Sequence, residues 1–252
     1  MDEFFCEVLK NTVARAGISY SFFSLILLFP NFNLDMSYKN EFGISPELIA
    51  RWLKAWSVSR KLPLPVIYKS GYKVDVGYEK QKTRYVFPEL TEDFIRLSQT
   101  ISEPWVFLKV CASKSKVNSV VSSNWQIQPQ GYMMSCNESM KFGNAVLGNQ
   151  YKLEFENFKS IFIVRIVTQS GELASTGHLV IVENLAVYDR ISTEPNHQRK
   201  GLASCIMKEL EKIAVSKGIF NNFLVATEEG KLLYESLGWK LYCLYTSIVI
   251  PG

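Results

Sequence analysis

A short run of residues at 198–203, Gln-Arg-Lys-Gly-Leu-Ala, carries the strongest chemical signal in the sequence. It lies between a β-branched apolar segment and an amphipathic segment with helical spacing. Gly201 and Ala203 keep the backbone bare where that helix would begin, and the first-turn N–H groups of a helix have no internal acceptors. Such a helix start binds anions. Arg199 and Lys200 add positive charge, so we expect a phosphorylated ligand, and a pyrophosphate fits both the geometry and the charge.

The spacing of this run resembles the Gln/Arg-x-x-Gly-x-Gly/Ala loop of the GNAT acyl-CoA N-acyltransferase superfamily. The resemblance implies that the loop cradles the pyrophosphate of coenzyme A, with acetyl-CoA as the co-substrate. Taken alone, so few fixed positions would also suit a solvated basic turn before a helix. The segments on either side of the loop are needed to separate the two interpretations.

Downstream of the loop, apolar residues recur every three or four positions from Leu202 to Ala214, which predicts an amphipathic helix. Gly218 is expected to end it, because glycine tolerates the left-handed conformation common after helices. Residues 223–226 are short and apolar, and a strand after such a helix predicts a parallel pair with a right-handed crossover. Residues 233–239, Leu-Tyr-Glu-Ser-Leu-Gly-Trp, resemble the Tyr-x-x-x-Gly-Phe/Trp ending of the GNAT core, whose Tyr is often the general acid.

Upstream of the loop, residues 160–167 and 173–182 are rich in β-branched and aromatic residues and flank a polar turn, which predicts a hairpin. Residues 185–193 predict a third strand. Pro195 follows this strand at the distance from the loop glycine that is found in many GNAT sequences. The features therefore agree in order and spacing, and the alternative is a generic α/β domain.

The order of elements implies an α/β (α+β) class with the GNAT acyl-CoA N-acyltransferase fold, in which helices flank a mixed central sheet. We assign the GNAT N-acetyltransferase domain to residues 151–252. Residues 36–145 are expected to form an α/β half, because helical and strand-like segments alternate there, and the resemblance implies that this half is either an accessory layer or a degenerate GNAT-like copy. Residues 137–150 carry several Gly and Asn residues and mark the predicted junction. Residues 1–35 are expected to be a helical N-terminal extension, or a segment upstream of a compact protein that begins near Met36.

The accessory half opens with a predicted helix, since Ser45 is a cap and Pro46 suits a first turn. Two tryptophans four positions apart, Trp52 and Trp56, predict a buried face of this helix. We expect this half to extend the sheet or to wall one side of the amine pocket. Four side chains are candidates for the wall, although packing or surface ion pairs would explain each equally well: Arg60, Arg84, Trp52 and Trp105.

Composition excludes several classes of protein. The net charge is only +4 and no long basic run occurs, so we expect no nucleic-acid partner. Five scattered cysteines predict reduced thiols in the cytoplasm rather than disulfides or a zinc site. With two histidines we expect no metal, and His197 is expected to be a solvated turn residue. The apolar residues 18–29 are too few for the ~20 of a spanning helix, so we expect no membrane association.

The resemblance implies a ternary complex in which a primary amine, on a small molecule or exposed on a protein, attacks the thioester directly. In related enzymes the pantetheine arm pairs with a splayed strand before the loop, and the pyrophosphate lies on the loop. Thr227 takes a place where the family often has Asn, a departure that leaves a side chain able to hydrogen-bond. The expected cofactor-binding residues are Ile191, Ser192, Thr193, Gln198, Arg199, Lys200, Gly201, Leu202, Ala203, Ser204 and Thr227.

The resemblance also implies catalytic residues. Tyr234 matches the position of the general acid, and an unperturbed phenol, with a pKa near ~10, is protonated at neutral pH. Packing of its ring in the core is the alternative. For the base we favour Asp189 over Glu183 and Glu194, because Asp189 shares strand parity with Ile191 and Thr193, whose backbone is expected to face the cofactor. Asp189 would equally pair with a cation, and many family members use a water chain instead.

Two further readings stay open for the function. The first is a catalytically silent acyl-CoA-binding module that acts as a sensor or scaffold. The second is a nucleotide-phosphate binder, which the absence of the G-x-x-x-x-G-K-[ST] and G-x-G-x-x-G patterns disfavours. The sequence also leaves open a homodimer and the identity of the acceptor.

Overall fold

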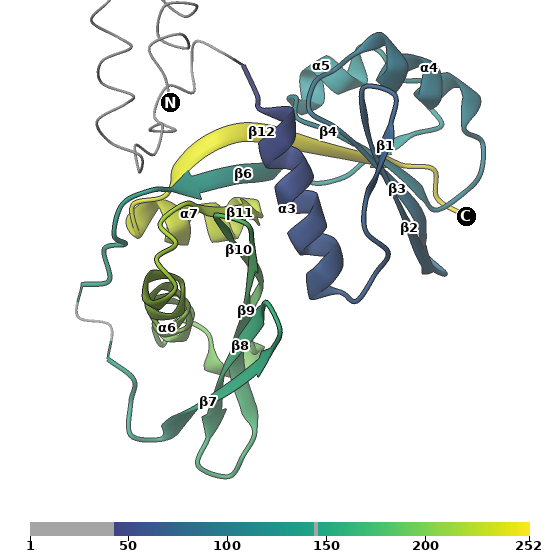
Figure 1. Cartoon of the computed structure of the whole chain (residues 1–252). Coiled ribbons are helices and arrows are strands. Elements are labelled where there is room, and N and C mark those ends of the chain that lie inside the picture. Colours follow the sequence, from purple (N-terminus) through teal and green to yellow (C-terminus); the bar gives the residue numbers. More distant parts are fainter. Residues whose placement is uncertain (1–42, 144–145) are drawn as a thin grey trace, which may run out of the picture. The chain divides into compact units, whose positions relative to one another are not determined.

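The structure is a computed structural model that describes residues 43–143 and 146–252 (Figure 1). The interpretations made for residues 1–35, and for a compact protein that begins near Met36, lie outside the described residues. In the described part of the chain no helix is long and apolar enough to cross a bilayer. The described helices are α3 (Pro46–Ser59), α4 (Glu92–Thr100), α5 (Lys114–Asn118), the 3-10 turn η1 (Pro195–His197), α6 (Leu202–Ser216) and α7 (Glu228–Ser236).

The described strands form a 12-stranded sheet in the order β1-β2-β3-β4-β12-β6-β11-β10-β9-β8-β7, with β5 beside β12. Most neighbours are antiparallel, and the pairs β3/β4 and β10/β11 are parallel. The predicted mixed sheet flanked by helices is therefore confirmed. The strand bounds are β1 (Val66–Tyr68), β2 (Gly71–Tyr78), β3 (Gln81–Phe87), β4 (Val106–Val110), β5 (Gln126–Ile127), β6 (Gly131–Cys136), β7 (Tyr151–Phe158), β8 (Ile161–Thr168), β9 (Leu173–Val182), β10 (Leu185–Thr193), β11 (Asn222–Ala226) and β12 (Lys240–Val249).

Strand β12 was not among the predicted elements, and it organises the sheet. It pairs with β6 through its first half and with β4 and β5 through its second half. Strand β6 in turn pairs with β11. The sheet is thus continuous from the strands of residues 66–110 to those of residues 151–193.

Helices α6 and α3 cover opposite sides of strands β9 and β10 (Figure 1). The apolar face of α6 buries Leu202, Ile206 and Leu210 against the sheet. Gly177 allows this close approach, because a Cβ on Gly177 would meet Ile206 at 2.4 Å. The crossover helix and its parallel strands, predicted from local spacing, are confirmed.

Helix α3 begins as predicted, with the Ser45 hydroxyl accepting a hydrogen bond from the Leu48 N–H. Trp52 and Trp56 are buried, at 4% and 6% exposure, which confirms the predicted inner face. Trp52 meets the Tyr245 ring of β12 edge to face, with ring centroids 5.5 Å apart. Helix α3 therefore joins β12 to β9 and β10 through one apolar face.

Candidate functional site

Strands β10 and β11 pair briefly and then separate. Their ladder ends at the pair Tyr188 and Leu224, while β10 runs on to Thr193 and β11 to Ala226. In the described sheet β10 has no ladder to β11 beyond that pair, so the strands open a wedge. The backbone of Ile191, Ser192 and Thr193 lies on this wedge, as the sequence predicted for a splayed strand. The Ser192 carbonyl accepts from the Ser175 hydroxyl at 2.7 Å and the Thr193 carbonyl from the Gln198 amide at 3.4 Å, and the remaining groups can pair with an extended ligand.

The loop at 198–203 presents a series of backbone donors. Arg199 and Gly201 both have positive φ, 59° and 74°, and Gly201 is the N-cap of α6. Within the described chain, the N–H groups of residues 199–204 have no hydrogen-bond acceptor. Consecutive free N–H groups at a helix start form an anion-binding concavity. The geometry expected from the sequence is therefore present.

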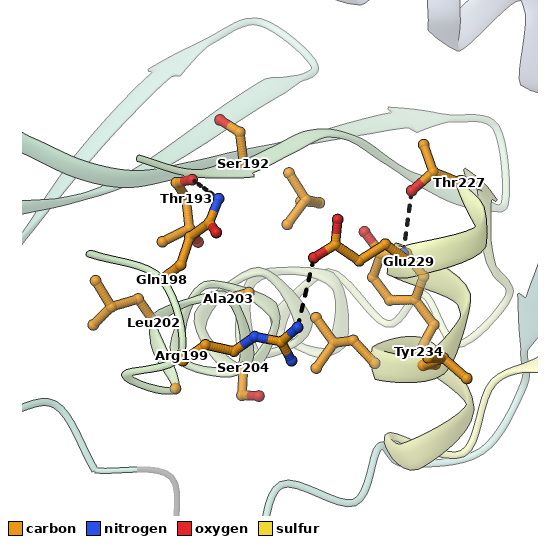
Figure 2. Close-up of a pocket in the computed structure, with 15 residues that line it drawn as sticks. Ser192, Thr193, Gln198, Arg199, Leu202, Ala203, Ser204, Thr227, Glu229 and Tyr234 are labelled. Carbon is orange, nitrogen blue, oxygen red and sulfur yellow. Dashed lines mark hydrogen bonds and ion pairs between the residues drawn. The ribbon is translucent and has the colours of Figure 1, made fainter. Parts of the chain in front are cut away.

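The wedge and the helix start open into one cavity of about 520 Å³ (Figure 2). Of the predicted cofactor-binding residues, only Lys200 is not among those that line it. The Lys200 side chain instead donates to the Asn196 carbonyl at 3.0 Å. The lining residues are Ile191, Ser192, Thr193, Gln198, Arg199, Gly201, Leu202, Ala203, Ser204, Thr227, Glu229, Gly230, Leu232, Leu233 and Tyr234.

Four lining residues of α7 were not predicted: Glu229, Gly230, Leu232 and Leu233. Helical spacing could have found Gly230, which lies four positions before Tyr234 and therefore on the same face. A Cβ on Gly230 would meet the Tyr234 ring at 3.3 Å, so glycine leaves room for that ring. Glu229 extends toward Arg199 across the cavity, with an N–O distance of 3.9 Å (Figure 2). Both side chains are strongly exposed, and such pairs contribute little to stability.

Tyr234 lines the cavity from α7, and its ring packs in the core beside Trp239. The residue is 8% exposed. Burial raises the pKa of Tyr234, and the charge of Asp189 raises it further. A raised pKa keeps the phenol protonated at neutral pH, so the hydroxyl is a hydrogen-bond donor there. Thr227 caps the same helix by accepting from the Gly230 N–H at 3.1 Å.

Residues 159–241 match the family model described as an acetyltransferase (GNAT) domain. This segment is a GNAT domain. It contains the wedge, the loop, α6 and Tyr234. No curated protein gives a significant sequence match.

Solved structures share the fold of the described chain at low sequence identity. A GCN5-related N-acetyltransferase from Kribbella flavida aligns with a TM-score of 0.61 at 12% identity, over 84% of this chain and 97% of that one. A GCN5-related N-acetyltransferase-like protein from Streptococcus suis gives 0.54 at 12%, over 81% and 97%. A GCN5-related N-acetyltransferase from Sphaerobacter thermophilus gives 0.51 at 11%, over 83% and 95%. The GNAT fold predicted from the sequence is thereby confirmed.

Strand β10 of the GNAT domain contains a bulge that the sequence analysis did not predict. Asp189 is opposite His178, but Ser192 is opposite Thr176, so Arg190 and Ile191 together face one residue of β9. Arg190 takes up the extra length with a φ of 54°. Strand parity is therefore broken between Asp189 and Ile191.

The reason given for Asp189, a shared strand face, is therefore wrong. The Asp189 carboxylate accepts a hydrogen bond from Ser59, the last residue of α3, at 2.7 Å. The Ile191 side chain instead lies beside Gly177 on the α6 face. Asp189 is still placed where β10 and β11 part, one residue beyond their last pair. Its position beside the wedge thus depends on the strand separation and not on parity.

Asp189 is held by two side chains at the end of α3. Arg60 forms an ion pair with it, using both terminal nitrogens, and Ser59 donates to the same carboxylate. The side chains of Arg60 and Asp189 are 19% and 16% exposed. The other carboxylates considered lie elsewhere: Glu183 is in the β9–β10 turn beside Lys54, and Glu194 follows the end of β10. Of the three, Asp189 is the one at the start of the wedge.

His197 is not the solvated turn residue that the sequence suggested. It is 9% exposed, and its Nδ1 lies 2.9 Å from the Tyr151 hydroxyl. Tyr151 begins β7, which the sequence analysis did not predict, and this contact explains why His197 is buried. Among the described residues no group of His, Cys, Asp and Glu could hold a metal ion. Cys111, Cys136, Cys205 and Cys243 are free thiols.

Proposed function

We propose that the chain is an N-acetyltransferase that transfers the acetyl group of acetyl-CoA to a primary amine in a ternary complex. The observation that carries the proposal is the row of N–H groups at residues 199–204 that have no acceptor among the described residues, beside the cavity that the wedge and Tyr234 line. A polyanionic tail would satisfy these donors. The GNAT domain at residues 159–241 supports acyl transfer as the reaction class.

The loop of the cavity fits coenzyme A in hydrogen bonding, and the exposed Arg199 side chain would exchange Glu229 for the anionic ligand. The loop donors and Arg199 would bind the pyrophosphate, and Gly201 offers space, since nothing lies within 4 Å of a Cβ built there. The backbone groups of Ile191, Ser192 and Thr193 that have no bond to a side chain would pair with the amides of the pantetheine arm. These assignments place the thioester end toward the narrow part of the wedge, near Tyr234.

Acetyl-CoA would supply the acetyl group and a thiolate leaving group, and the products would be an amide and free CoA. Tyr234 would keep its proton until the sulfur leaves, because its pKa is raised by burial and by Asp189. Asp189 would face the incoming ammonium and favour its approach. As the carboxylate at the start of the wedge, Asp189 is also our choice for the group that takes the proton from the amine.

Two measurements on the same protein test the proposal. Calorimetry with CoA measures binding, and thiol release from acetyl-CoA across a panel of small amines and lysine peptides measures turnover. Binding with turnover supports the transferase. Binding without turnover on any amine would favour the alternative of an acyl-CoA sensor or scaffold, and absence of binding at millimolar CoA would contradict both. We propose the cytoplasm as the location, which the free thiols support.

A further inference from the structure

Three cationic side chains from three different elements gather around the end of α3. They are Arg60 at the C-cap of α3, Arg84 of β3 and Lys109 of β4, and we call them the cation cluster. The guanidinium carbons of Arg60 and Arg84 lie 4.6 and 3.6 Å from the centroid of the same Trp56 ring. The Lys109 amino group lies 5.7 Å from the centroid of the Tyr245 ring. Burial lowers the pKa of Lys109 well below its ordinary value, and the positive charges of Arg84 and Arg60 lower it further.

The cation cluster has more positive than negative charge. Asp189 contacts the cation cluster, and its carboxylate is already paired with Arg60. In the described structure neither Arg84 nor Lys109 has an ion-pair partner. Lys109 donates to the neutral Ser247 hydroxyl at 2.7 Å. The Gln81 amide, turned with its oxygen toward Arg84, accepts from two guanidinium nitrogens at 3.0 and 2.8 Å.

Burial makes this excess charge costly. Arg84 is 9% exposed, and burial lowers its pKa to about 10, so it still carries its charge at neutral pH. A buried cation loses hydration, and neutral partners such as Trp56, Gln81 and Ser247 compensate for that loss less well than an anion would. An anion beside Arg84 and Lys109 would remove this penalty.

The tyrosine ring that Lys109 lies over, Tyr245, carries a buried hydroxyl without a partner in the described chain. Tyr245 is 5% exposed, and its buried hydroxyl has no hydrogen bond within the described chain. Burial raises the pKa of Tyr245, whereas the nearby Arg84 opposes the rise. Buried hydroxyls nearly always have a partner, so this donor is available to an oxygen of a bound anion.

Asp189 connects the cation cluster to the proposed reaction centre. Its carboxylate binds Arg60 on the α3 side of the sheet. Its charge also raises the pKa of Tyr234, which lines the cavity. A molecule that reached from Asp189 into the cation cluster would therefore lie next to the wedge.

We propose that the acceptor carries an anionic group in addition to its primary amine, and that this group binds Arg84, Lys109 and the Tyr245 hydroxyl while the amine faces Asp189. The inference rests on the proposed function, because it specifies the amine of that reaction. The acceptor class is then a zwitterionic amine, either an amino acid or an amine with a phosphate or sulfonate group. A guanidinium and an ammonium suit all three anions.

Matched pairs of amines test the inference. Amino acids are compared with their amides, and phosphorylated or sulfonated amines with their neutral parents, by kcat/KM in the presence of acetyl-CoA. We expect the anionic member of the preferred pair to exceed its neutral partner by about 10- to 100-fold, as for a charge-assisted hydrogen bond. The identity of that pair distinguishes carboxylate from phosphate and sulfonate. Equal kcat/KM values within every pair would overturn the inference and leave the transferase proposal standing.

Variants of the cation cluster give a second readout. Arg84→Gln should lower kcat/KM for the anionic amine far more than for the neutral one, and Arg84→Lys should restore part of the preference for the anionic amine. Lys109→Gln is the independent variant if Arg84→Gln does not fold. Arg96→Gln is the control, because Arg96 pairs with Glu92 on the surface and is 64% exposed. A loss that is the same for charged and neutral amines would indicate a purely structural role for Arg84 and contradict the inference.

Direct binding separates failure of this inference from failure of the proposed function. Calorimetry of the anionic amines without acetyl-CoA needs no turnover. Binding that Arg84→Gln abolishes supports the anion site even if no acetyl transfer is found. If acetyl transfer is observed but no anionic amine binds or is preferred, the anion site is excluded.

Discussion

Two regions of the molecule are rich in positive charge and present it in opposite ways. At the cofactor side the Arg199 side chain is 90% exposed, and the loop adds unpartnered backbone N–H groups. At the α3 side Arg84 is 9% exposed and stacked on Trp56. Water and salt screen the first set of charges and hardly reach the second. The first region therefore suits a ligand held by many backbone donors, and the second suits discrimination between charged and neutral molecules.

Gly201→Glu tests the cofactor side and is expected to have the largest effect of the variants. We expect the CoA affinity to fall at least about 100-fold, because bulk and negative charge would occupy the place where the N–H groups converge. Calorimetry with CoA measures the change. Gly77→Glu is the matched control, because the φ values are 73° at Gly77 and 74° at Gly201, and nothing lies within 4 Å of a Cβ at either position. An unchanged CoA affinity in Gly201→Glu would show that the loop is not the anion site.

Tyr234→Phe tests the chemistry between the two regions. We expect turnover to fall about 100-fold with CoA affinity unchanged, since a general acid contributes roughly that much. Steady-state rates and calorimetry separate the two quantities, and Tyr78→Phe, at an exposed tyrosine, is the control. Because the pKa of Tyr234 is raised, its deprotonation should not cause an alkaline loss of rate below pH ~10. Full activity in Tyr234→Phe would remove it from the mechanism.

Asp189→Asn should affect stability as well as rate, because it leaves Arg60 without its counterion. We expect a loss of roughly 1–3 kcal/mol in the free energy of unfolding, as for a partly buried charge that loses its partner. Denaturant unfolding measures it. The double variant Asp189→Asn with Arg60→Gln should recover part of the loss, since no unpaired charge remains. No recovery in the double variant would show that the pair is not what stabilises this end of α3.

The smallest effect is expected from Lys109→Met, which sharpens the contrast between exposed and buried charge. The pKa of Lys109 is lowered in the folded state, so between that pKa and the ordinary value of about 10.4 the unfolded chain binds more protons. Stability from this group therefore rises with pH across that window. Relative to the parent, Lys109→Met should gain most near pH 7 and less near pH 10, in denaturant unfolding without ligand. A pH-independent difference would contradict the unfavourable charge at Lys109.

Structural features that depend on neighbouring residues were predicted better than those that depend on residues distant in the sequence. The path from β10 through the loop and α6 to α7 followed from helical spacing, Gly201 and Gly218, which act over a few neighbours. The bulge at Arg190 and Ile191 could not be predicted, because it is defined by the register against β9. Strand β7 was missed, although its alternation from Tyr151 onward was present in the sequence.

The cation cluster also shows what the sequence could not reveal. Arg60 and Arg84 were named as candidates for a wall of the amine pocket, but Lys109 was not. Each cation lies on a different element, and their proximity arises only when α3, β3 and β4 come together. The two tryptophans named for the wall lie elsewhere. Trp52 is buried in the core, and Trp105 lies beside Gly252, where a Cβ would meet the Trp105 Nε1 at 2.6 Å.

The position of β12 has a consequence for biosynthesis. The strands that it joins, β4 and β6, leave the ribosome more than a hundred residues before it does, as the pairing of Leu108 with Ile248 illustrates. Until β12 emerges, each of these strands presents an open edge, and such edges are prone to pair with other chains. Closure of the sheet must therefore wait until β12 has been synthesised, and the edges of β4 and β6 stay open during that interval.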